Sequence, residues 1–451
     1  MIIAMKKPNL FLLTCFVFLP GLLLSQEDTT IQKPHKRFKV IPFPVVSYDA
    51  DLGFQYGLMG ELYDYGDPSR YPDYWHKLKI EISRYTRGSG VNQIFFDSKH
   101  LIPRGIRLTA DASYLTEKAL DFYGFNGYQA IYQPEWENDD DTAYITRMFY
   151  RHERKLFRFT CDFQGPLYGQ KLLWLAGIGI MNFQTRPVDI ERLNKGKKEE
   201  KILPDTITLY DKYVQWGIIP EDEKKGGNAN FIKAGIVYDS RDNEPNPMRG
   251  LWDEALLAYA PGFLFNHDVS FLKLILIHRQ YFTLVKKKLS FCYRIAYQGT
   301  IAGHTPFYFQ PYMLSSFSQV TKTDGLGGAK NLRGILRNRV VGDGVAWANI
   351  ELRWKIVDFV IAKQNLYVGA VAFGDAGMVV QEVKFDRNNI DPAVLPDYFD
   401  FSYVNDRVHP SLGGGLRIAY NENFIIAFDY GIALNRKDGK GGFYINFSNL
   451  F

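Results

Sequence analysis

Strict alternation of apolar and polar residues recurs along most of this chain. Residues 106–114 (IRLTADASY) alternate throughout, and residues 424–434 place an apolar or aromatic side chain at every second position. A period of two is typical of a β-strand whose two faces meet different surroundings. Runs of this length exceed an average strand of ~5–6 residues and match the ~9–11 residues with which a tilted strand crosses a bilayer. The alternation therefore predicts transmembrane β-strands.

The predicted fold is all-β, a sixteen-stranded antiparallel transmembrane β-barrel, and the even number suits a bacterial single-chain barrel. The strands are expected near residues 45–62, 77–86, 91–99, 106–115, 143–152, 155–164, 171–183, 229–239, 251–260, 270–282, 289–300, 345–356, 366–375, 411–420, 424–434 and 442–451. The alternative architecture is a large secreted β-sandwich, which usually has shorter strands and polar outward positions.

The connections predict two unlike ends for the barrel if the N-terminus is periplasmic. Short turns are expected on the periplasmic side, at 87–90, 165–170, 283–288 and 421–423. Long inserts are expected on the outer side, at 184–228, 301–344 and 378–410. This asymmetry is typical of outer-membrane barrels. The connection 116–142 fits poorly, because it would be a long periplasmic turn.

The first residues are interpreted as a signal peptide, residues 1–25. Lys6 and Lys7 precede a mainly apolar run from Leu10 to Leu24, which falls short of the ~20 residues that span a bilayer. An uncleaved anchor helix is the less favoured alternative. Residues 26–42 are then expected to be a short periplasmic linker and residues 43–451 the barrel domain. The chain is therefore expected to be an integral protein of the bacterial outer membrane.

Composition argues against several other classes of protein. The formal net charge is only +5, and no basic patch interleaved with aromatic residues indicates nucleic-acid binding. The three cysteines lie far apart, so neither a disulfide framework nor a metal site is expected, and no cofactor is implied. The histidines are dispersed and no G-x-S-x-G motif occurs. We expect no enzyme, with a barrel phospholipase whose residues come from separate strands as the open alternative.

One arginine and two carboxylates are expected to meet inside the barrel. Parity places Asp375 and Phe373 on the lumenal face of one predicted strand, and Glu351 on the lumenal face of the strand before it. A charge removed from water needs a partner, and the planar fork of arginine matches carboxylates. Arg333 must then reach them from a loop that folds back into the barrel.

These residues resemble a known family. Arg333-Gly334-Ile335 is similar to the Arg-Gly-aromatic sixth loop of the BamA/TamA-type outer-membrane assembly and two-partner-secretion proteins, the bacterial surface antigen family, although Ile335 replaces the usual aromatic residue. Residues 373–377 (FGDAG) are similar to its F-x-D-x-G motif on the thirteenth strand, and Glu351 stands where it has an acid. The resemblance implies an inward-folded sixth extracellular loop and a loop lock made by Arg333, Gly334, Glu351, Phe373, Asp375 and Gly377.

A second stretch resembles the family's turn between the eighth and ninth strands, D-x-R followed by P-x-x-G. The matching residues are Asp239, Arg241, Asp242, Pro247 and Gly250. The resemblance implies a periplasmic turn motif at this place in the chain.

The last strand ends on an aromatic residue. Phe443, Ile445, Phe447 and Phe451 are expected on one face, which suits a closing strand at the membrane interface and resembles the C-terminal sorting signal of outer-membrane proteins. An ordinary amphipathic edge strand is the alternative.

The expected seam joins the first strand, with Gly53, Gly57 and Gly60, to the last strand, with Asn446. Glycine leaves the register of a strand weakly specified, and in the family this seam opens toward lipid as a lateral gate. Relief of crowding at barrel closure is the alternative reason for the glycines.

The resemblance implies insertion or translocation of proteins (or lipid) at the outer membrane. The expected partners are outer-membrane lipid and protein clients or periplasmic or surface proteins. Residues 26–40 are too short for a POTRA domain, so a barrel-only member is expected. The alternative function is a passive pore, or a structural barrel that scaffolds a partner on the inserts at 184–228 and 378–410.

Overall fold

The computed structural model describes residues 37–67, 74–266, 269–316, 324–361, 364–420 and 424–451. The expected signal peptide, and the expected linker up to residue 36, lie outside these residues. The first strand begins at Phe38, so the barrel starts inside the segment expected to be a linker.

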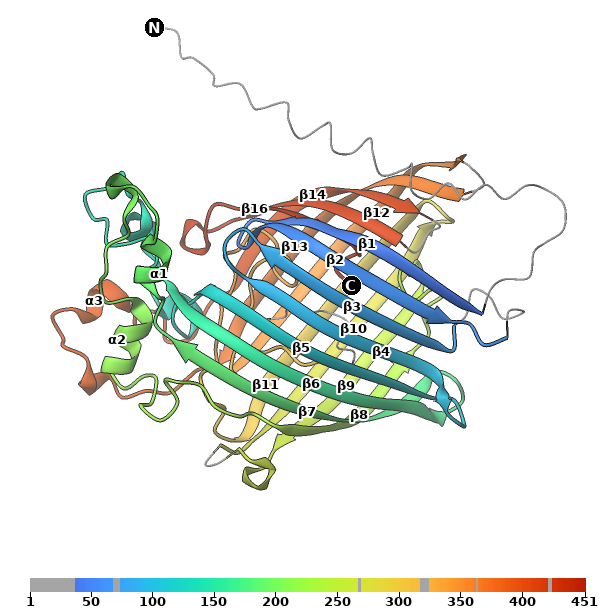
Figure 1. Cartoon of the computed structure of the whole chain (residues 1–451), viewed down its shortest axis with the longest axis horizontal. Helices are drawn as coiled ribbons and strands as arrows, with labels where there is room; N and C mark the ends of the chain where they lie inside the picture. The colour runs from blue at the N-terminus through green and yellow to red at the C-terminus, as the bar shows by residue number, and fades with distance from the viewer. Residues whose placement is uncertain (1–36, 68–73, 267–268, 317–323, 362–363, 421–423) are drawn as a thin grey trace, which may run out of the picture.

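Sixteen antiparallel strands close into one barrel, which confirms the predicted fold class (Figure 1). Each strand pairs with its neighbours in sequence, and the last pairs with the first. The strands are β1 Phe38–Asp49, β2 Gly53–Asp64, β3 His76–Tyr85, β4 Gly90–Ile102, β5 Ile106–Asp121, β6 Arg151–Tyr168, β7 Leu172–Arg186, β8 Phe231–Asp239, β9 Gly250–Ala260, β10 Phe271–Val285, β11 Leu289–Gly303, β12 Gly344–Ile361, β13 Gln364–Gln381, β14 His409–Tyr420, β15 Phe424–Ala433 and β16 Gly442–Asn446.

The count of sixteen was right although two strands were predicted wrongly. The predicted strand 45–62 is two strands, β1 and β2, joined by a tight turn at 50–52. The side chain of Asp49 accepts the backbone N–H groups of Asp51 and Leu52 at 2.8 and 3.2 Å and stabilises this turn. Even-numbered residues face outward on both sides of the turn, so the alternation runs through it without a break.

The predicted strand at 143–152 does not exist as a separate strand. Instead β5 extends to Asp121, and residues 122–150 form a long connection before β6. This correction also removes the long periplasmic turn that fitted poorly.

The turn predicted at 87–90 lies at the end of the barrel that carries the long connections. Those near 165–170 and 283–288 are confirmed as short turns at the opposite end. The turn predicted at 421–423 lies outside the described residues.

The long connections gather at one end of the barrel, with three short helices (Figure 1). The helices are α1 Ile190–Asn194, α2 Leu209–Gln215 and α3 Leu395–Tyr398. Within the described residues, no helix combines the length and the apolar character that crossing a membrane requires.

The two faces of the wall differ in chemistry. On β15 the outward residues Phe424, Tyr430 and Ile432 are exposed, whereas the inward residues Ala427 and Asp429 are buried. An apolar outward face and a polar inward face are typical of a barrel wall that faces lipid.

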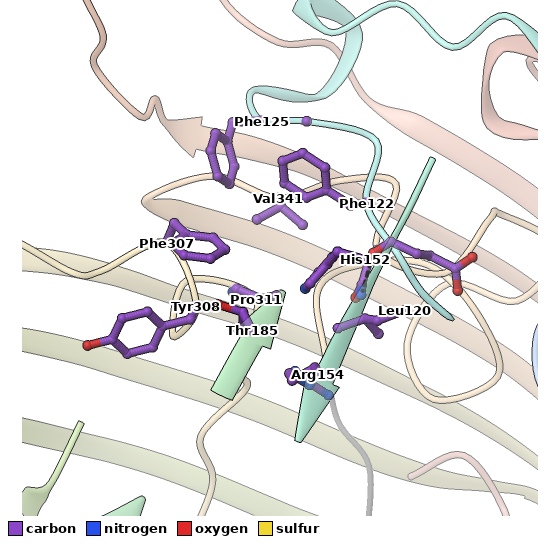
Figure 2. A pocket seen from close by; sticks show the side chains of 13 residues that line it. Leu120, Phe122, Phe125, His152, Arg154, Thr185, Phe307, Tyr308, Pro311 and Val341 are labelled. Atoms are coloured by element: carbon purple, nitrogen blue, oxygen red, sulfur yellow. Dashed lines mark hydrogen bonds between the residues drawn. The ribbon is translucent and has the colours of Figure 1, made fainter. Parts of the chain in front are cut away.

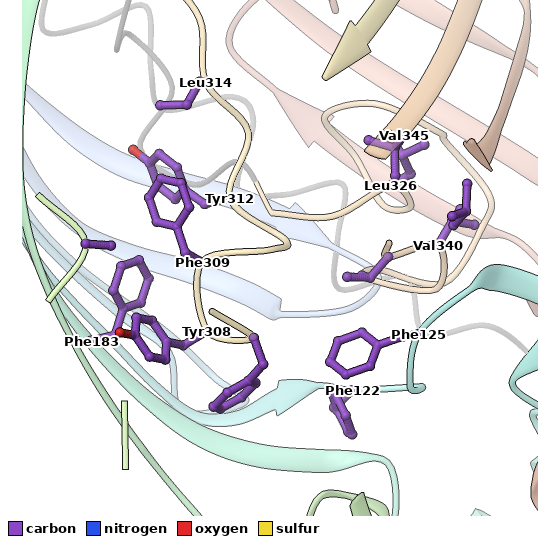
Figure 3. Close-up of a cluster of buried hydrophobic side chains, with 14 of the residues drawn as sticks. Phe122, Phe125, Phe183, Tyr308, Phe309, Tyr312, Leu314, Leu326, Val340 and Val345 are labelled. Carbon is purple, nitrogen blue, oxygen red and sulfur yellow. The ribbon is translucent and has the colours of Figure 1, made fainter. Parts of the chain in front are cut away.

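The main core lies inside the barrel, under the long connections. Aromatic side chains from the wall and from several long connections, among them 122–150 and 304–343, form it (Figure 3). Phe309 is fully buried, and its ring centroid lies 4.9 Å from that of Phe271 and 5.3 Å from that of Tyr312. The lumen is therefore packed beneath the outer end of the barrel.

Candidate functional site

The connection between β11 and β12, residues 304–343, contributes a folded tip to the lumen. Leu326 and Val340 pair through two backbone hydrogen bonds of 3.0 and 3.1 Å, and Gly328 N–H donates to the carbonyl of Ile335 at 2.8 Å. Gly334 has a φ of 90°, and a Cβ there would collide with the backbone of Gly431 on β15. Glycine at 334 therefore permits both the turn and the close approach to the wall.

Arg333 is fully buried and carries the central charge of the site. Its Nε and Nη2 donate to the two carboxylate oxygens of Asp375 at 2.9 and 3.0 Å, and its Nη1 donates to Glu351 at 2.7 Å. The guanidinium carbon lies 3.5 Å from the centroid of the Phe373 ring. The geometry is the two-pronged pairing that was expected from the sequence, with the ring of Phe373 stacked beneath it.

The two carboxylates have further partners. Glu351 accepts from Arg353 Nε at 2.7 Å, and Asp375 accepts from Asn349 at 2.8 Å. Asp375 also accepts the backbone N–H of Arg333 at 3.0 Å. The charges of Arg333, Glu351 and Asp375 are buried and paired with one another. Paired charges of this kind are suited to hold the loop in place.

A second ionic cluster ties the same loop to the opposite wall, and sequence analysis did not identify it. Arg337 donates to Glu117 on β5 at 2.5 Å and to Asp324 at 2.6 Å. Arg154 on β6 donates to Asp324 at 2.8 Å and to Glu117 at 2.9 Å. Burial alone would raise the pKa of Asp324, but the two guanidiniums outweigh it and lower that pKa below its ordinary value.

The only sequence signal for this second cluster was parity, because Glu117 and Arg154 fall on the lumenal faces of their strands. Parity identifies a charge that faces inward but not its partner on a distant loop. With both clusters formed, the loop spans the lumen from β12 and β13 to β5 and β6.

The predicted turn motif lies between β8 and β9. Arg241 donates to both carboxylate oxygens of Asp239 at 3.0 Å, and Asp242 accepts the N–H groups of Met248 and Arg249 at 3.0 and 3.2 Å. Gly250 has a φ of 114°. The structure thus brings these residues together in one turn, with Pro247 buried in it.

The C-terminal residues do not all share one face, which corrects the sequence prediction. Phe443 and Phe447 are exposed on the outside, but Phe451 is only 9% exposed and lies in the lumen. Its carbonyl accepts from Arg353 at 2.7 Å, and its ring lies 5.1 Å from the guanidinium carbons of Arg294 and Arg353. The reason is that β16 ends at Asn446, after which strand alternation no longer determines where a side chain points.

The seam is also made differently from the prediction. Gly53, Gly57 and Gly60 lie on β2, one strand away from the seam. β1 meets β16 in only two residue pairs, Tyr48 with Ile445 and Asp49 with Tyr444.

The loop tip contacts the seam strand directly. Gly334 N–H donates to the hydroxyl of Tyr444 at 3.2 Å, and Lys330 donates to the side chain of Asn446 at 2.8 Å. The loop tip is therefore hydrogen-bonded both to β12 and β13, through Arg333, and to the last strand, β16.

The described residues border two hollows of very different size. The larger is an open space of about 440 Å³ along the wall, lined by residues that include Tyr238, Asp253, His278 and Tyr297. A cavity of about 20 Å³ lies between Leu120, Phe122, His152, Phe307 and Val341, which is room for about one water molecule (Figure 2). No group of three or more His, Cys, Asp or Glu side chains in the described part of the chain could hold a metal ion.

The fold and the lumenal loop define a transmembrane β-barrel protein of the outer-membrane type. The family model of the Omp85 superfamily domain matches residues 198–451, more than half of the chain. The chain belongs to the Omp85 superfamily, which confirms the resemblance to BamA/TamA-type proteins at the level of the superfamily.

One solved structure supports the fold. The chain resembles BamA from Haemophilus ducreyi lacking POTRA domains 1–3, with a TM-score of 0.53 and 16% identity over 92% of this chain and 70% of that chain. CdiB from Escherichia coli superposes with a TM-score of 0.49 and 10% identity, over 92% of this chain and 63% of that chain. No curated protein matches the chain by sequence.

We predict that Arg333→Ala lowers the amount of folded barrel, because it strands Glu351 and Asp375 as buried charges. Breaking a buried pair costs about 3–5 kcal/mol. Heat-modifiable migration on gels measures the folded fraction in membranes. Arg436→Ala, at an exposed arginine, is the matched control and is expected to fold normally. Wild-type folding of Arg333→Ala would contradict the lock.

Arg337→Ala is expected to destabilise the barrel less than Arg333→Ala, because Arg154 still pairs with both Glu117 and Asp324. Urea unfolding of the two purified variants compares the losses. The double variant Arg154→Ala/Arg337→Ala removes both cations and is expected to lose more than either single variant. Equal losses for Arg337→Ala and the double variant would contradict a shared cluster.

Deletion of Phe451 is expected to slow assembly in the outer membrane, because it removes both the proposed sorting residue and the contact with Arg353. Pulse-labelling followed by gel migration gives the assembly rate. Leu450→Ala serves as a neighbouring control. Unchanged rates after the deletion would contradict a role for this residue in assembly.

Proposed function

We propose that this barrel inserts or translocates proteins (or lipid) at the bacterial outer membrane through a seam that parts between β1 and β16. The observation that carries the proposal is the seam itself, with two residue pairs. By comparison, β1 and β2 share twelve pairs and β15 and β16 share five. Each backbone hydrogen bond adds about 1 kcal/mol of net stability, so the junction with the fewest pairs opens first.

The contacts of the loop tip support a link between the lock and the seam. Arg333 bonds to β12 and β13, and the adjacent Gly334 bonds to Tyr444 on β16. Leu336 N–H also donates to the carbonyl of Asp438, just before β16, at 2.9 Å. In this proposal the lock holds the tip against the stable wall, and the tip in turn positions the last strand.

The proposal places the protein in the outer membrane, with its exposed apolar side chains against lipid. The expected partners are membrane lipid and protein clients, or other proteins of the periplasm or the cell surface. The proposed activity needs no cofactor and no catalytic residue, because insertion and translocation make and break no covalent bond.

A passive pore is less well supported. The connection 304–343 is anchored on both sides of the lumen, through Arg333 on one wall and Arg337 on the other. Phe451, which follows β16, contacts Arg353 on β12 and occupies part of the lumen. An open channel would require these segments to leave.

A scaffold for a surface partner is the second candidate, and one observation favours it. The connections 187–230 and 382–408 pack against each other, with ring centroids of Trp216 and Tyr398 5.0 Å apart and those of Tyr213 and Phe399 5.9 Å apart. A preformed outer surface of this kind suits protein binding.

A disulfide across the seam tests the function. Tyr48→Cys/Ile445→Cys links a residue pair of β1 and β16, whereas Ile94→Cys/Ala112→Cys links a pair of the ordinary junction between β4 and β5. Cells depleted of the protein are rescued with each variant, with and without reductant, and their outer-membrane proteomes are quantified. We expect loss of other membrane or surface proteins when the seam is linked, and rescue by reduction. The control variant is expected to rescue in both states.

Full rescue by the oxidised seam variant would contradict an opening seam and would favour the scaffold.

A further inference from the structure

The first strand carries two prolines at its centre, Pro42 and Pro44. β1 pairs with β2 without interruption, from Phe38 with Asp64 to Asp49 with Gly53. Proline has no N–H, so it fits within a sheet only where its nitrogen faces away from the paired neighbour. Both prolines must therefore direct their nitrogens toward the other side of β1, which is the seam.

An independent hydrogen bond gives the same direction. The N–H of Tyr65 donates to the carbonyl of Arg37 at 2.8 Å, which continues the pairing of β1 with β2. In an antiparallel ladder the residues that bond one neighbour alternate with those that bond the other. The backbone N–H and C=O groups of odd-numbered β1 residues thus bond β2, and those of even-numbered residues point toward the seam. Pro42 and Pro44 leave two gaps among the donors of the seam edge.

Strand β16 stops where these gaps begin. In the register of Tyr48 with Ile445, the residues after Asn446 would run alongside Val46, Pro44 and Pro42. They turn into the lumen instead, where Asn449 contacts Arg417 and Phe451 contacts Arg353. Among the described strands, none pairs with the seam side of residues 38–47.

Aromatic side chains occupy this part of the wall, and we call Phe43, Phe424 and Phe447 the aromatic latch. The rings of Phe43 on β1 and Phe424 on β15 are stacked, with centroids 6.2 Å apart. The ring of Phe447 lies 6.0 Å from that of Phe424. Side-chain contact thus replaces a backbone ladder, and rings can part without breaking any backbone hydrogen bond.

The edge also faces lipid with apolar side chains. Phe38, Val40 and Val46 are exposed on the outside at 55, 70 and 48%. A strand that added to this edge would leave its carbonyls opposite Pro42 and Pro44 without donors, in surroundings where water cannot replace them. A hydrocarbon chain has no polar groups to satisfy and incurs no such cost.

We propose that Pro42 and Pro44 determine the substrate class of the seam, excluding added β-strands and admitting the acyl chains of lipids past the aromatic latch. The inference rests on the proposed function, in which the seam parts. It names lipid as the substrate and makes the two prolines the residues that select it.

The effect of the prolines on the seam is tested first by cross-linking. Val45→Cys and Ser448→Cys would come opposite each other only if β16 extended along β1 in its present register. The background carries Cys161→Ser and Cys292→Ser. In this background the parent is expected to form little disulfide, and Pro42→Val/Pro44→Val to form about tenfold more or greater, because two backbone hydrogen bonds become available together. Val40→Ala changes an outward side chain on the same strand without adding a backbone donor and is expected to match the parent. Equal cross-linking in all three would overturn the role of the prolines.

The substrate class is tested with vesicles that contain fluorescent NBD-labelled phospholipid and the purified barrel. Dithionite quenching measures exchange of the label between leaflets. The parent is expected to accelerate exchange over empty vesicles, and Pro42→Val/Pro44→Val to slow it. The oxidised seam variant Tyr48→Cys/Ile445→Cys is expected to stop exchange until it is reduced.

Failure of this inference can be told apart from failure of the proposed function. If the parent moves no lipid while the linked seam still depletes client proteins in cells, lipid selection is wrong and the proposed function stands. A photoreactive residue can replace Val46 while both prolines are kept. A cross-link from this position to a client strand would likewise overturn the exclusion of strands. If the linked seam affects neither lipid nor clients, the proposed function falls as well.

Discussion

The pairing of the Arg333 guanidinium with Glu351 and Asp375 is the interaction on which the rest of the lumen depends. All three side chains are buried, and each is costly to keep there without the others. The pairing fixes the loop tip against β12 and β13, and Gly334 then lies close enough to the wall to reach Tyr444. A single charge cluster thus sets the position of a loop that touches both the most extensively paired wall and the weakest junction.

Stability is distributed unevenly around the barrel, and this unevenness carries the functional argument. Long ladders and inward ion pairs hold most of the wall, while β1 and β16 share two residue pairs. Beyond that short ladder the rings of the aromatic latch lie between β1 and β15. The edge of β1 there lacks two backbone N–H donors, because of Pro42 and Pro44. A barrel that needed only to be stable would gain from closing this junction. We therefore attribute its weakness to function.

Alternation and charge were enough to predict the barrel and the meeting of Arg333 with its two acids, because facing direction follows from a period of two. The strand number came out right only because one missed strand and one wrongly predicted strand cancelled. The turn at 50–52 escaped detection because it preserves parity, so β1 and β2 look like one long strand. The inward position of Phe451 escaped because the ladder ends at Asn446. The cluster of Glu117, Arg154, Asp324 and Arg337 escaped because partners on a distant loop leave no trace in local spacing.

Hydrogen–deuterium exchange of the barrel in lipid tests the central claim most directly, since it reports the opening of each strand separately. The account predicts that amides of β16 and of the seam edge of β1 exchange much faster than those of β12 and β13. It further predicts that Arg333→Ala accelerates exchange in β16 more than in β3 or β4, which the loop tip does not position. Uniform exchange around the barrel, or an effect of Arg333→Ala spread evenly over all strands, would contradict a locked loop that positions an opening seam.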